Sequence, residues 1–337
     1  MKKALYIDCA SGITGNMIMG ALLELVEDRD WFLNEMSSLH LDVDIQIEEA
    51  VRNGISGTYV NIIAQDCPSC TPDHAKEIID RSNIDPKAKG LAKRIIDRLV
   101  KAESKVRHCT LEDVTFDRCG AFPAITSIIG TSVLLTKLHP DLIYSSIVND
   151  GYGFVEDIDG TVPVPVPTTS EIFADSHVIS RQIAVNTELV TPTGAAIIAE
   201  IGTSFDVMPA MDVEKIGWGC GNLNLKIPHI LKISMGEIIR HPDEMLVFET
   251  TVESTTTEIL GYVMKALKDA HAYEAYYTPG YTPDPIFHIT VMARDVVKEA
   301  IIKILEDNFT ILRMSFHRES LIPYTRTFDK ARTTYRD

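Results

Sequence analysis

The spacing of apolar residues changes several times along the chain, and each spacing predicts a different element. Residues 2–8 contain a compact apolar run that is typical of a buried strand, and residues 16–27 repeat with the period of a helix. Apolar and polar residues then alternate over 42–52 and 57–66, which predicts an antiparallel pair that turns around residues 53–57. The chain therefore begins as an α/β domain.

Helical spacing dominates the middle of the chain. The stretch from residue 72 to about 105 predicts two helices, the second of which restarts at Pro86. Residues 121–138 are helical and apolar all round, so we expect this helix to be buried. An extended edge strand or loop is then indicated by Pro163, Pro165 and Pro167. Two threonines, Thr168 and Thr169, are expected to cap a short helix that ends at residue 174.

From residue 245 on, strand and helix patterns alternate in a regular order. Strands are predicted at 245–253, 273–279, 285–293 and 311–328, and helices at 258–271 and 295–308, the last capped by Asp295. The order βαββαβ is that of the split ferredoxin-like arrangement. The sequence thus predicts an α+β protein, with a larger N-terminal α/β domain over 1–240 that carries glycine-rich loops and a ferredoxin-like C-terminal domain over 245–337.

Composition narrows the class of protein and its partners. The 337 residues, 45% hydrophobic and 24% charged, are enough for two cores of a soluble globular protein. A formal net charge of −16 argues against nucleic acid and anionic membranes as partners, since both would repel the chain. No apolar run has signal length or approaches the roughly 18 residues of a membrane span, so we expect a cytoplasmic protein. Its 6 cysteines are then free thiols or ligands.

The stretch YIDCASGITGNM, residues 6–17, carries the first candidate site. A strand ends at Asp8, and two glycines, a serine and a threonine follow before an apolar helix begins. The first amides of a helix have no partners and the helix dipole is positive there, so this turn can present N–H groups to an anion. Asp8 either faces a ligand crevice at the end of the strand or caps the turn. The alternative for the whole stretch is an ordinary loop between strand and helix.

Two later stretches have the same character. In TELVTPTGAA, residues 187–196, a Pro-Gly turn opens a helix and forms a second candidate anion pocket. In GWGCGN, residues 217–222, three glycines indicate close backbone approach or positive φ. Together with the first loop and with residues 151–153, these loops are expected to converge on one cavity. The alternative is that they are merely tight turns.

The pair Cys67 and Cys70, in CPSC, has the one metal-like spacing in the chain. A structural zinc site would need two further ligands, of which His74 is the nearest candidate. The alternative is a pair of ordinary exposed thiols.

Several segments taken together resemble one protein family. The matching segments are YIDCASGITGNMIMGALLEL, KAESKV, VTFDRCGAFPAITSIIG, GYGFVEDIDGTVPVPVPTTSEI, ELVTPTGAAII, GWGCGN with PHILKI, and FETTVESTTTEILGYVMKAL with YEAYYTPGY. They follow the order of the LarC-type nickel insertion proteins and cover nearly the whole chain, which is identified as a divergent member. The resemblance implies a nickel chelatase or cyclometallase of the lyase class. Such an enzyme inserts nickel into a pyridinium bis-thiocarboxylate mononucleotide during maturation of the lactate racemase cofactor, using CTP with manganese or magnesium.

The resemblance also implies a set of site residues. Asn16 stands where the family usually has Asp, and Thr115, Asp117 and Arg118 stand where it has a His-x-His-Glu run. Arg118 cannot coordinate a metal but can bind phosphate. The implied catalytic residues are Asp8 and Asp117, and the implied metal ligands are Asp8, Asp117, Cys119, Cys67 and Cys70. The implied cofactor-binding residues are Ser11, Gly12, Gly15, Asn16, Arg118, Glu188, Thr191, Thr193 and Gly219.

Three functions stay open at this point: an active nickel insertion enzyme, a non-catalytic relative that binds a nucleotide or a partner, and an enzyme for a different metal or nucleotide. Convergence of Asp8, Asp117 and Cys119 would favour the first, whereas a salt bridge from Arg118 would favour the second. The resemblance leads us to expect a further strand and helix after the ferredoxin-like unit. An exposed edge strand in such a unit commonly pairs with another copy, so we expect a homo-oligomer.

Overall fold

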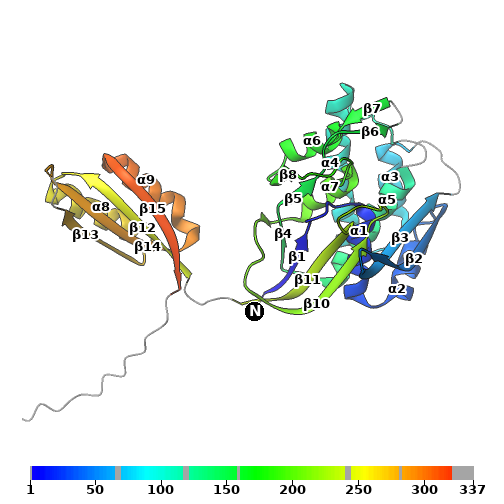
Figure 1. Ribbon diagram of the computed structural model, residues 1–337, viewed down its shortest axis with the longest axis horizontal. Coiled ribbons are helices and arrows are strands. Elements are labelled where there is room, and N and C mark those ends of the chain that lie inside the picture. The colour runs from blue at the N-terminus through cyan, green and yellow to red at the C-terminus, as the bar shows by residue number, and fades with distance from the viewer. Residues whose placement is uncertain are drawn as a thin grey trace, which may run out of the picture. The chain divides into compact units, whose positions relative to one another are not determined.

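The computed structural model describes residues 2–64, 70–116, 121–157, 160–239, 244–280 and 283–320. The chain divides into two compact units, Met1–Ile239 and Arg240–Asp337 (Figure 1). The first unit contains, in chain order, β1 (Lys3–Asp8), α1 (Gly15–Val26), α2 (Arg29–Ser37), β2 (Val43–Arg52), β3 (Ile55–Ala64), α3 (Pro72–Arg81), α4 (Pro86–Arg107), α5 (Ala121–Leu138), β4 (Leu142–Ser145), β5 (Val148–Asp150), β6 (Phe154–Asp157), β7 (Gly160–Pro163), α6 (Pro167–Ala174), β8 (Ser180–Gln182), α7 (Pro192–Ile201), β9 (Ser204–Phe205), β10 (Met211–Cys220) and β11 (Ile230–Ile238).

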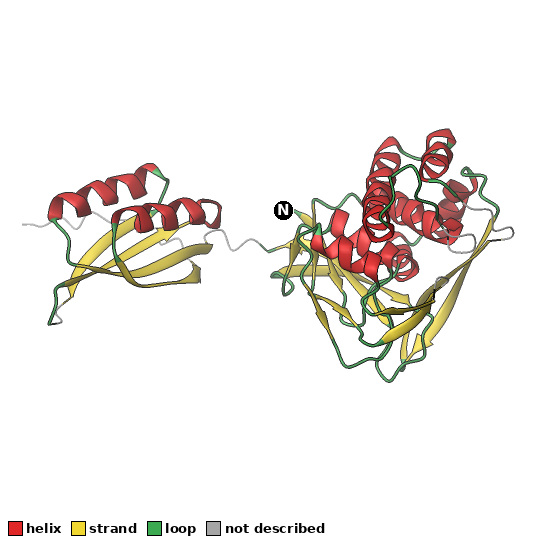
Figure 2. Ribbon diagram, turned by 90° about the horizontal axis from the view of Figure 1, so that it is seen from above, coloured by secondary structure: helices red, strands yellow, loops and turns green. Residues whose placement is uncertain are grey.

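A large mixed sheet forms the base of the first unit. Its 7 strands are ordered β2-β3-β10-β11-β1-β4-β9, and β1 runs parallel to β4 but antiparallel to β11. Figure 2 shows the helices of this unit gathered on one side of the strands. Helix α1 packs on β10, β3 and β11, and α5 packs on α1. The core of the unit therefore lies between the sheet and these helices.

The glycines of β10 allow α1 to lie directly on the sheet. A Cβ added at Gly219 would be 1.8 Å from the Met17 carbonyl oxygen, and one at Gly217 would be 2.0 Å from the Ala21 carbonyl oxygen. Neither glycine has a positive φ. Of the two reasons that the sequence offers for the glycines, close backbone approach is therefore the correct one at these positions.

Most predicted elements of this unit are present, often to within a residue or two. Strands β2 and β3 form the predicted hairpin, and Asn53 and Gly54 at its turn have φ values of 49° and 85°, as a two-residue turn requires. Helix α1 begins at Gly15, one residue before the predicted start, because the Thr14 side chain accepts a hydrogen bond from the Met17 amide.

Two details of the proline-rich stretch were predicted wrongly. Pro167 is the first residue of α6 and not part of an extended segment, and Val166 occupies the N-cap position. Proline fits there because its missing N–H would have no helical partner. Thr168 and Thr169 lie inside the first turn, where their hydroxyls donate to Glu103 and to the Val190 carbonyl instead of capping the helix.

Helix α5 corrects the expectation that no segment approaches the length of a membrane span. Its 18 residues have a mean hydropathy of 1.4, so by length and composition the helix could cross a membrane. Of this window, 72% is buried inside the unit. As predicted, α5 is a buried core helix, which packs against α1 and α4.

The second unit is a separate antiparallel sheet with its own core. It contains β12 (Glu244–Glu253), α8 (Thr257–Asp269), β13 (Glu274–Gly280), β14 (Ile286–Ala293), the short 3-10 helix η1 (Asp295–Val297), α9 (Lys298–Asn308) and β15 (Ile311–Ser320). The 4 strands are ordered β13-β14-β12-β15, and Figure 2 shows α8 and α9 on one face of this sheet. Asp295 is not the helix cap that we expected, because it lies inside η1 and pairs with Arg318.

Substituting Gly219 by alanine tests the contact between α1 and β10. Gly219→Ala would place a methyl group 1.8 Å from the Met17 oxygen, so the helix must move away from the sheet. We expect the free energy of unfolding of the first unit to fall by about 2 kcal/mol or more, as in an overpacked core. The measurement is urea unfolding, with Gly90→Ala in α4 as the matched control. That added Cβ meets only Arg94 Nη1, at 3.7 Å, so the control should be unchanged or more stable. Equal stability of the two variants would contradict the packing.

Candidate functional site

Two loops that are far apart in sequence pair through their backbones. Ile13 and Val190 form an isolated parallel bridge, in which the Ile13 amide donates to the Leu189 carbonyl at 3.0 Å. The Thr191 amide donates back to the Ile13 carbonyl at 3.3 Å. The residues that follow, Thr14 and Thr191, are the N-caps of α1 and α7. The bridge therefore holds the starts of these two helices side by side.

Glycines permit this close pairing. Gly12 has a φ of +84°, and a Cβ at this position would be 2.2 Å from the Leu189 carbonyl oxygen. A Cβ at Gly194 would be 2.2 Å from the Ile13 carbonyl oxygen. Gly12 is required for its left-handed backbone and for this approach, and Gly194 for the approach alone, so the glycines in both loops serve one contact.

The N-terminal half of α5 completes the arrangement. A Cβ at Gly15 would lie 2.4 Å from Ser127 Oγ and 3.1 Å from Thr193 Cγ2, so the first residue of α1 lies against the second turn of α5 and the first turn of α7. Ser127 itself donates a hydrogen bond to the Ala124 carbonyl at 2.9 Å. First-turn residues of α1, α5 and α7 line one place, where the positive ends of three helix dipoles meet.

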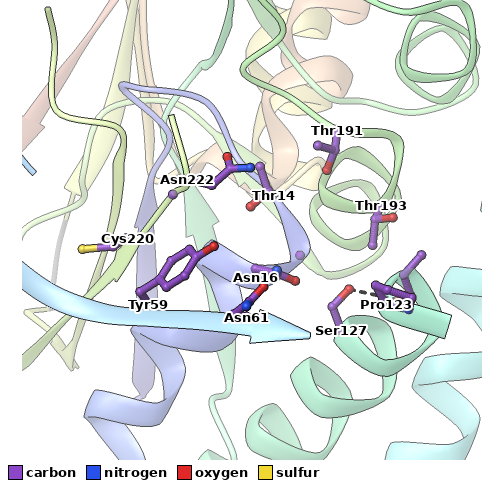
Figure 3. Close-up of a pocket in the computed structure, with 13 residues that line it drawn as sticks. Thr14, Asn16, Tyr59, Asn61, Pro123, Ser127, Thr191, Thr193, Cys220 and Asn222 are labelled. Carbon is purple, nitrogen blue, oxygen red and sulfur yellow. Dashed lines mark hydrogen bonds between the residues drawn. The ribbon is translucent and has the colours of Figure 1, made fainter. Parts of the chain in front are cut away.

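A cavity of about 290 Å³ opens at this point (Figure 3). Figure 3 shows the Tyr59, Asn16 and Ser127 side chains turned toward the same space. The lining residues are Thr14, Gly15, Asn16, Tyr59, Asn61, Pro123, Ala124, Ser127, Thr191, Thr193, Cys220, Gly221 and Asn222. Over the described part of the chain, this lining has no Asp, Glu, Lys, Arg or His. The cavity thus offers hydroxyls, amides and helix dipoles without formal charge, a donor set that suits an anion.

Side chains of strand β5 hold both loops by hydrogen bonds to their backbones. Asp150 Oδ1 accepts hydrogen bonds from the amides of Gly151 (2.7 Å), Leu189 (2.8 Å) and Val190 (3.1 Å). Burial raises the pKa of this carboxyl, and the three amide hydrogen bonds oppose that shift. The neighbouring Asn149 donates to the Ala10 carbonyl at 2.9 Å, in the first loop. The two loops are therefore fixed to one strand as well as to each other.

The wall formed by residues 220–222 is held by His229 and Arg52. The Gly221 amide donates to the His229 carbonyl at 2.9 Å, and the Leu223 amide donates to His229 Nδ1 at 3.1 Å. Burial, with a smaller contribution from Arg52, lowers the pKa of His229 to about 4, so this imidazole is neutral at pH 7 and can accept that bond. Arg52 Nε donates to the Gly221 carbonyl at 2.7 Å.

Sequence comparison identifies the family. The profile of the family described as "Nickel insertion protein" matches residues 5–337. The chain belongs to the nickel insertion protein family. It is 37% identical to the pyridinium-3,5-bisthiocarboxylic acid mononucleotide nickel insertion protein of Acetivibrio thermocellus, over 92% of this chain and 80% of that protein. It is 30% identical to the protein of the same name from Clostridium kluyveri, over 99% of this chain and 88% of that protein.

One solved structure overlaps with part of this family member. It is described as "LarC2, the C-terminal domain of a cyclometallase involved in the synthesis of the NPN cofactor of lactate racemase, apo form". It is 28% identical, covers 23% of this chain and 55% of that chain, and has a TM-score of 0.22. Because this structural overlap is small, the family assignment rests on the sequence matches.

The cofactor-binding residues expected in this nickel insertion protein fall into two groups. Gly15, Asn16, Thr191 and Thr193 line the cavity. The others that the structure describes do not line it: Ser11, Gly12, Glu188 and Gly219. Of these, Gly12 packs on Leu189 and Gly219 packs on α1, so both glycines shape the cavity through backbone contacts.

Asp8 lies outside the cavity lining and is engaged elsewhere. Its Oδ2 is 2.9 Å from Lys232 Nζ, and its Oδ1 accepts a hydrogen bond from the Ala10 amide at 3.3 Å. The strand next to β1 is the antiparallel β11, which places Lys232 directly opposite Asp8. The rule that the carboxyl ends of strands face a ligand applies to parallel strands joined by crossover helices. It does not apply to the pair β1 and β11, because these strands are antiparallel. The carboxylate instead stabilises the turn and pairs with a cation.

The remaining metal candidates are mostly outside the described residues. This applies to Cys67, Asp117, Arg118 and Cys119. Cys70 is buried, and burial raises the pKa of its thiol, which disfavours the thiolate that a metal needs. Within the described ranges, no three His, Cys, Asp or Glu side chains are grouped so as to hold a metal ion. The expected convergence of Asp8, Asp117 and Cys119 therefore stays a prediction.

Several residues that line the cavity carry no recognisable motif in the sequence. Tyr59 and Asn61 lie on the predicted strand β3, and Ser127 lies on the buried helix α5, where neither pattern signals a site. Asn222 ends the glycine-rich stretch, whose glycines give the stronger signal. The alternation of β3 could have indicated two of these residues, because it places Tyr59 and Asn61 on one face of the strand and the buried Val60 and Ile62 on the other.

The buried Asp150 makes the stability of the first unit depend on pH. The pKa of Asp150 is higher in the folded state than in the unfolded state, so between these two values the folded state keeps a proton that the unfolded state has released. The protonated side chain therefore contributes its full stabilisation below the unfolded pKa of about 3.9. That contribution is lost as the pH rises through the folded pKa. Asp150→Asn keeps an oxygen acceptor for the amides but does not ionise.

We therefore expect the free energy of unfolding of Asp150→Asn, minus that of the wild type, to increase as the pH rises from about 4 to about 7. Urea unfolding of both proteins across this range is the measurement. A difference that stays constant or decreases would contradict a raised pKa at Asp150.

Proposed function

We propose that this protein inserts nickel into pyridinium-3,5-bisthiocarboxylic acid mononucleotide, and that the cavity between α1, α5 and α7 holds the mononucleotide. The observation that carries the proposal is the family match over residues 5–337 on a chain in which three of the expected loops, residues 6–17, 187–196 and 217–222, line one cavity, whereas residues 151–153 do not. A relative with this named activity aligns with 92% of the chain, which supports carrying the activity over. Nickel is a substrate in this reaction.

The cavity suits the phosphate end of such a ligand. The whole chain has a formal net charge of −16, so a phosphate must be attracted by local groups rather than by the overall field. Helix starts supply partial positive charge and free amides without adding a cation. The N-cap threonines Thr14 and Thr191 add hydroxyl donors beside these amides, because each hydroxyl oxygen accepts a helix N–H and its own hydrogen can be donated. The volume, about 290 Å³, is at the lower end for a small-molecule site.

Nickel delivery is assigned to the segments around Cys67 and around Asp117 and Cys119. The backbone supports this choice, because the Phe116 amide donates to the Cys70 carbonyl at 2.9 Å, and these two residues adjoin the two segments in the chain. Asp117 and Cys119 also precede Ala121, where α5 begins, by only a few residues. Thiolate and carboxylate groups in such a place can carry a divalent metal to a ligand bound at the start of α5.

Further parts of the proposal follow from the family. We propose that the reaction uses CTP with manganese or magnesium, that the protein acts in the cytoplasm, and that it forms a homo-oligomer. We also propose that the second unit is ferredoxin-like, which its βαββαβ order and its strand order β13-β14-β12-β15 support.

A binding module without nickel insertion is the second candidate function. Two observations favour it: Asp8 is paired with Lys232, and the Cys70 thiol is buried with a raised pKa. Such a protein would hold the nucleotide in the same cavity but would not release a nickel-containing product.

A nickel insertion assay with a cavity variant tests the proposed function. We expect the wild type to convert the mononucleotide to its nickel adduct, detected by mass spectrometry. Asn222→Ala removes an amide from the cavity lining, and loss of a hydrogen bond to a charged ligand should raise KM about tenfold or more. Asn34→Ala, at an exposed position of α2, is the matched control and should behave as wild type. Binding without any adduct would favour the binding module.

Equilibrium dialysis with nickel and with manganese, in the presence and absence of CTP, tests the metal and nucleotide requirements. We expect the protein to retain nickel and to hydrolyse CTP to CMP when the mononucleotide and manganese are present. Cys67→Ser should lower the amount of nickel retained, because a hydroxyl is a poorer ligand than a thiolate. Unchanged nickel retention in this variant would remove Cys67 from the delivery site.

A further inference from the structure

One wall of the cavity differs from the helix starts in its chemistry. Tyr59 is the one aromatic side chain among the described residues of the lining, and its ring projects from β3 toward Asn16 (Figure 3). Asn61, two residues along the same strand, lines the cavity on the same face. The cavity therefore has one end built from helix starts and one side built from an aromatic ring and an amide.

Arg52 fixes this side of the cavity. Its guanidinium carbon is 5.6 Å from the centroid of the Tyr59 ring, within the range of a cation–π contact. Its Nε donates to the Gly221 carbonyl at 2.7 Å, and its Nη1 donates to the Val51 carbonyl at 3.1 Å. Arg52 does not line the cavity itself. It is a positioning residue that ties the Tyr59 ring to the wall at residues 220–222.

We propose that Tyr59 is the specificity-determining residue that binds the aromatic ring of the ligand, and that Arg52 behind it selects a ring with acidic substituents. This inference rests on the proposed function, because it assigns the two ends of one ligand to two parts of the same cavity. A flat heterocycle lies on the phenol ring, while the phosphate of the same molecule faces α1, α5 and α7.

Physical chemistry supports both halves of the inference. Stacking of a heterocycle on an aromatic side chain tolerates different rings but requires a flat partner, so Tyr59 separates ring-bearing ligands from ring-free sugar phosphates. The guanidinium carbon of Arg52 is 5.6 Å from the centroid of the Tyr59 ring. At this range, its attraction to a carboxylate or thiocarboxylate on a ligand ring stacked on Tyr59 is not fully screened. A pyridinium ring with two such groups fits the subsite better than a ring with a neutral carboxamide.

The first test measures binding without nickel, by calorimetry. The probes are pyridinium-3,5-dicarboxylic acid mononucleotide, which is the oxygen analogue of the proposed substrate, and ribose 5-phosphate, which has no ring. We expect the wild type to bind the mononucleotide at least about tenfold more tightly than the sugar phosphate, a typical effect of one stacked ring. Equal affinity of the wild type for both probes would overturn the inference without the need for any variant.

Variants of Tyr59 locate the ring contact. Tyr59→Leu should lose most of the preference for the mononucleotide while its affinity for ribose 5-phosphate stays near the wild-type value. Tyr59→Phe keeps the ring and should retain the preference. Tyr262→Leu is the matched control, because Tyr262 is 65% exposed on α8 of the second unit. A folded Tyr59→Leu protein with the full wild-type preference would overturn the assignment.

Substitution of Arg52 tests the second half. The comparison uses the dicarboxylate mononucleotide and a pyridinium mononucleotide whose ring carries a neutral carboxamide. Arg52→Met should weaken binding of the dicarboxylate severalfold more than binding of the carboxamide ring, because loss of the held wall affects both ligands and loss of the charge affects only the dicarboxylate. Arg81→Met is the control, since the Arg81 side chain is 75% exposed on α3. An equal loss of affinity for both ligands, or no loss, would overturn the role of Arg52 in selection.

These binding measurements separate the inference from the proposed function. Ring preference that depends on Tyr59, in a protein that forms no nickel adduct, would support the inference and contradict the proposed activity. Nickel insertion that proceeds with wild-type KM in Tyr59→Leu would support the activity and overturn the inference.

Discussion

The backbone pairing of Ile13 with Val190 is the contact on which the site depends. Two hydrogen bonds, of 3.0 and 3.3 Å, join loops that are separated by most of the first unit in sequence. Each loop ends in a threonine that caps a helix, so this pairing places two helix starts at one point. Asp150 holds the second loop through the Leu189 and Val190 amides, and this buried carboxylate is tolerated because the amides satisfy one of its oxygens.

The described lining of the resulting cavity carries no charged side chain. A neutral lining with helix dipoles can attract a phosphate while the rest of the chain is strongly acidic, and it leaves no cation in the described lining that would repel a nickel ion nearby. Arg52 does not line the cavity: its guanidinium contacts the Tyr59 ring, and its Nε donates to the Gly221 carbonyl. In the proposed function, the nucleotide site and the nickel delivery segments can therefore both belong to the first unit.

The sequence predicted the loops of this site better than its walls. Glycine and threonine patterns around Gly12 and Thr191 signal tight turns and helix starts, because these residues have backbone requirements that can be recognised locally. The Asp8–Lys232 pair was not predictable, since only the antiparallel neighbour β11 brings the lysine opposite the aspartate. Tyr59 and Ser127 were missed for the same reason: an ordinary strand and a buried helix become a site only through what the tertiary fold places beside them.

The central claim is that the paired loops form the nucleotide site of this nickel insertion protein. The most direct measurement is a crystal structure of the full chain with the oxygen analogue of the mononucleotide bound. The account predicts electron density for the phosphate against the first turns of α1, α5 and α7, within hydrogen-bonding distance of Thr14 or Thr191. A mononucleotide bound only outside this cavity, with Ile13 and Val190 still paired, would contradict it.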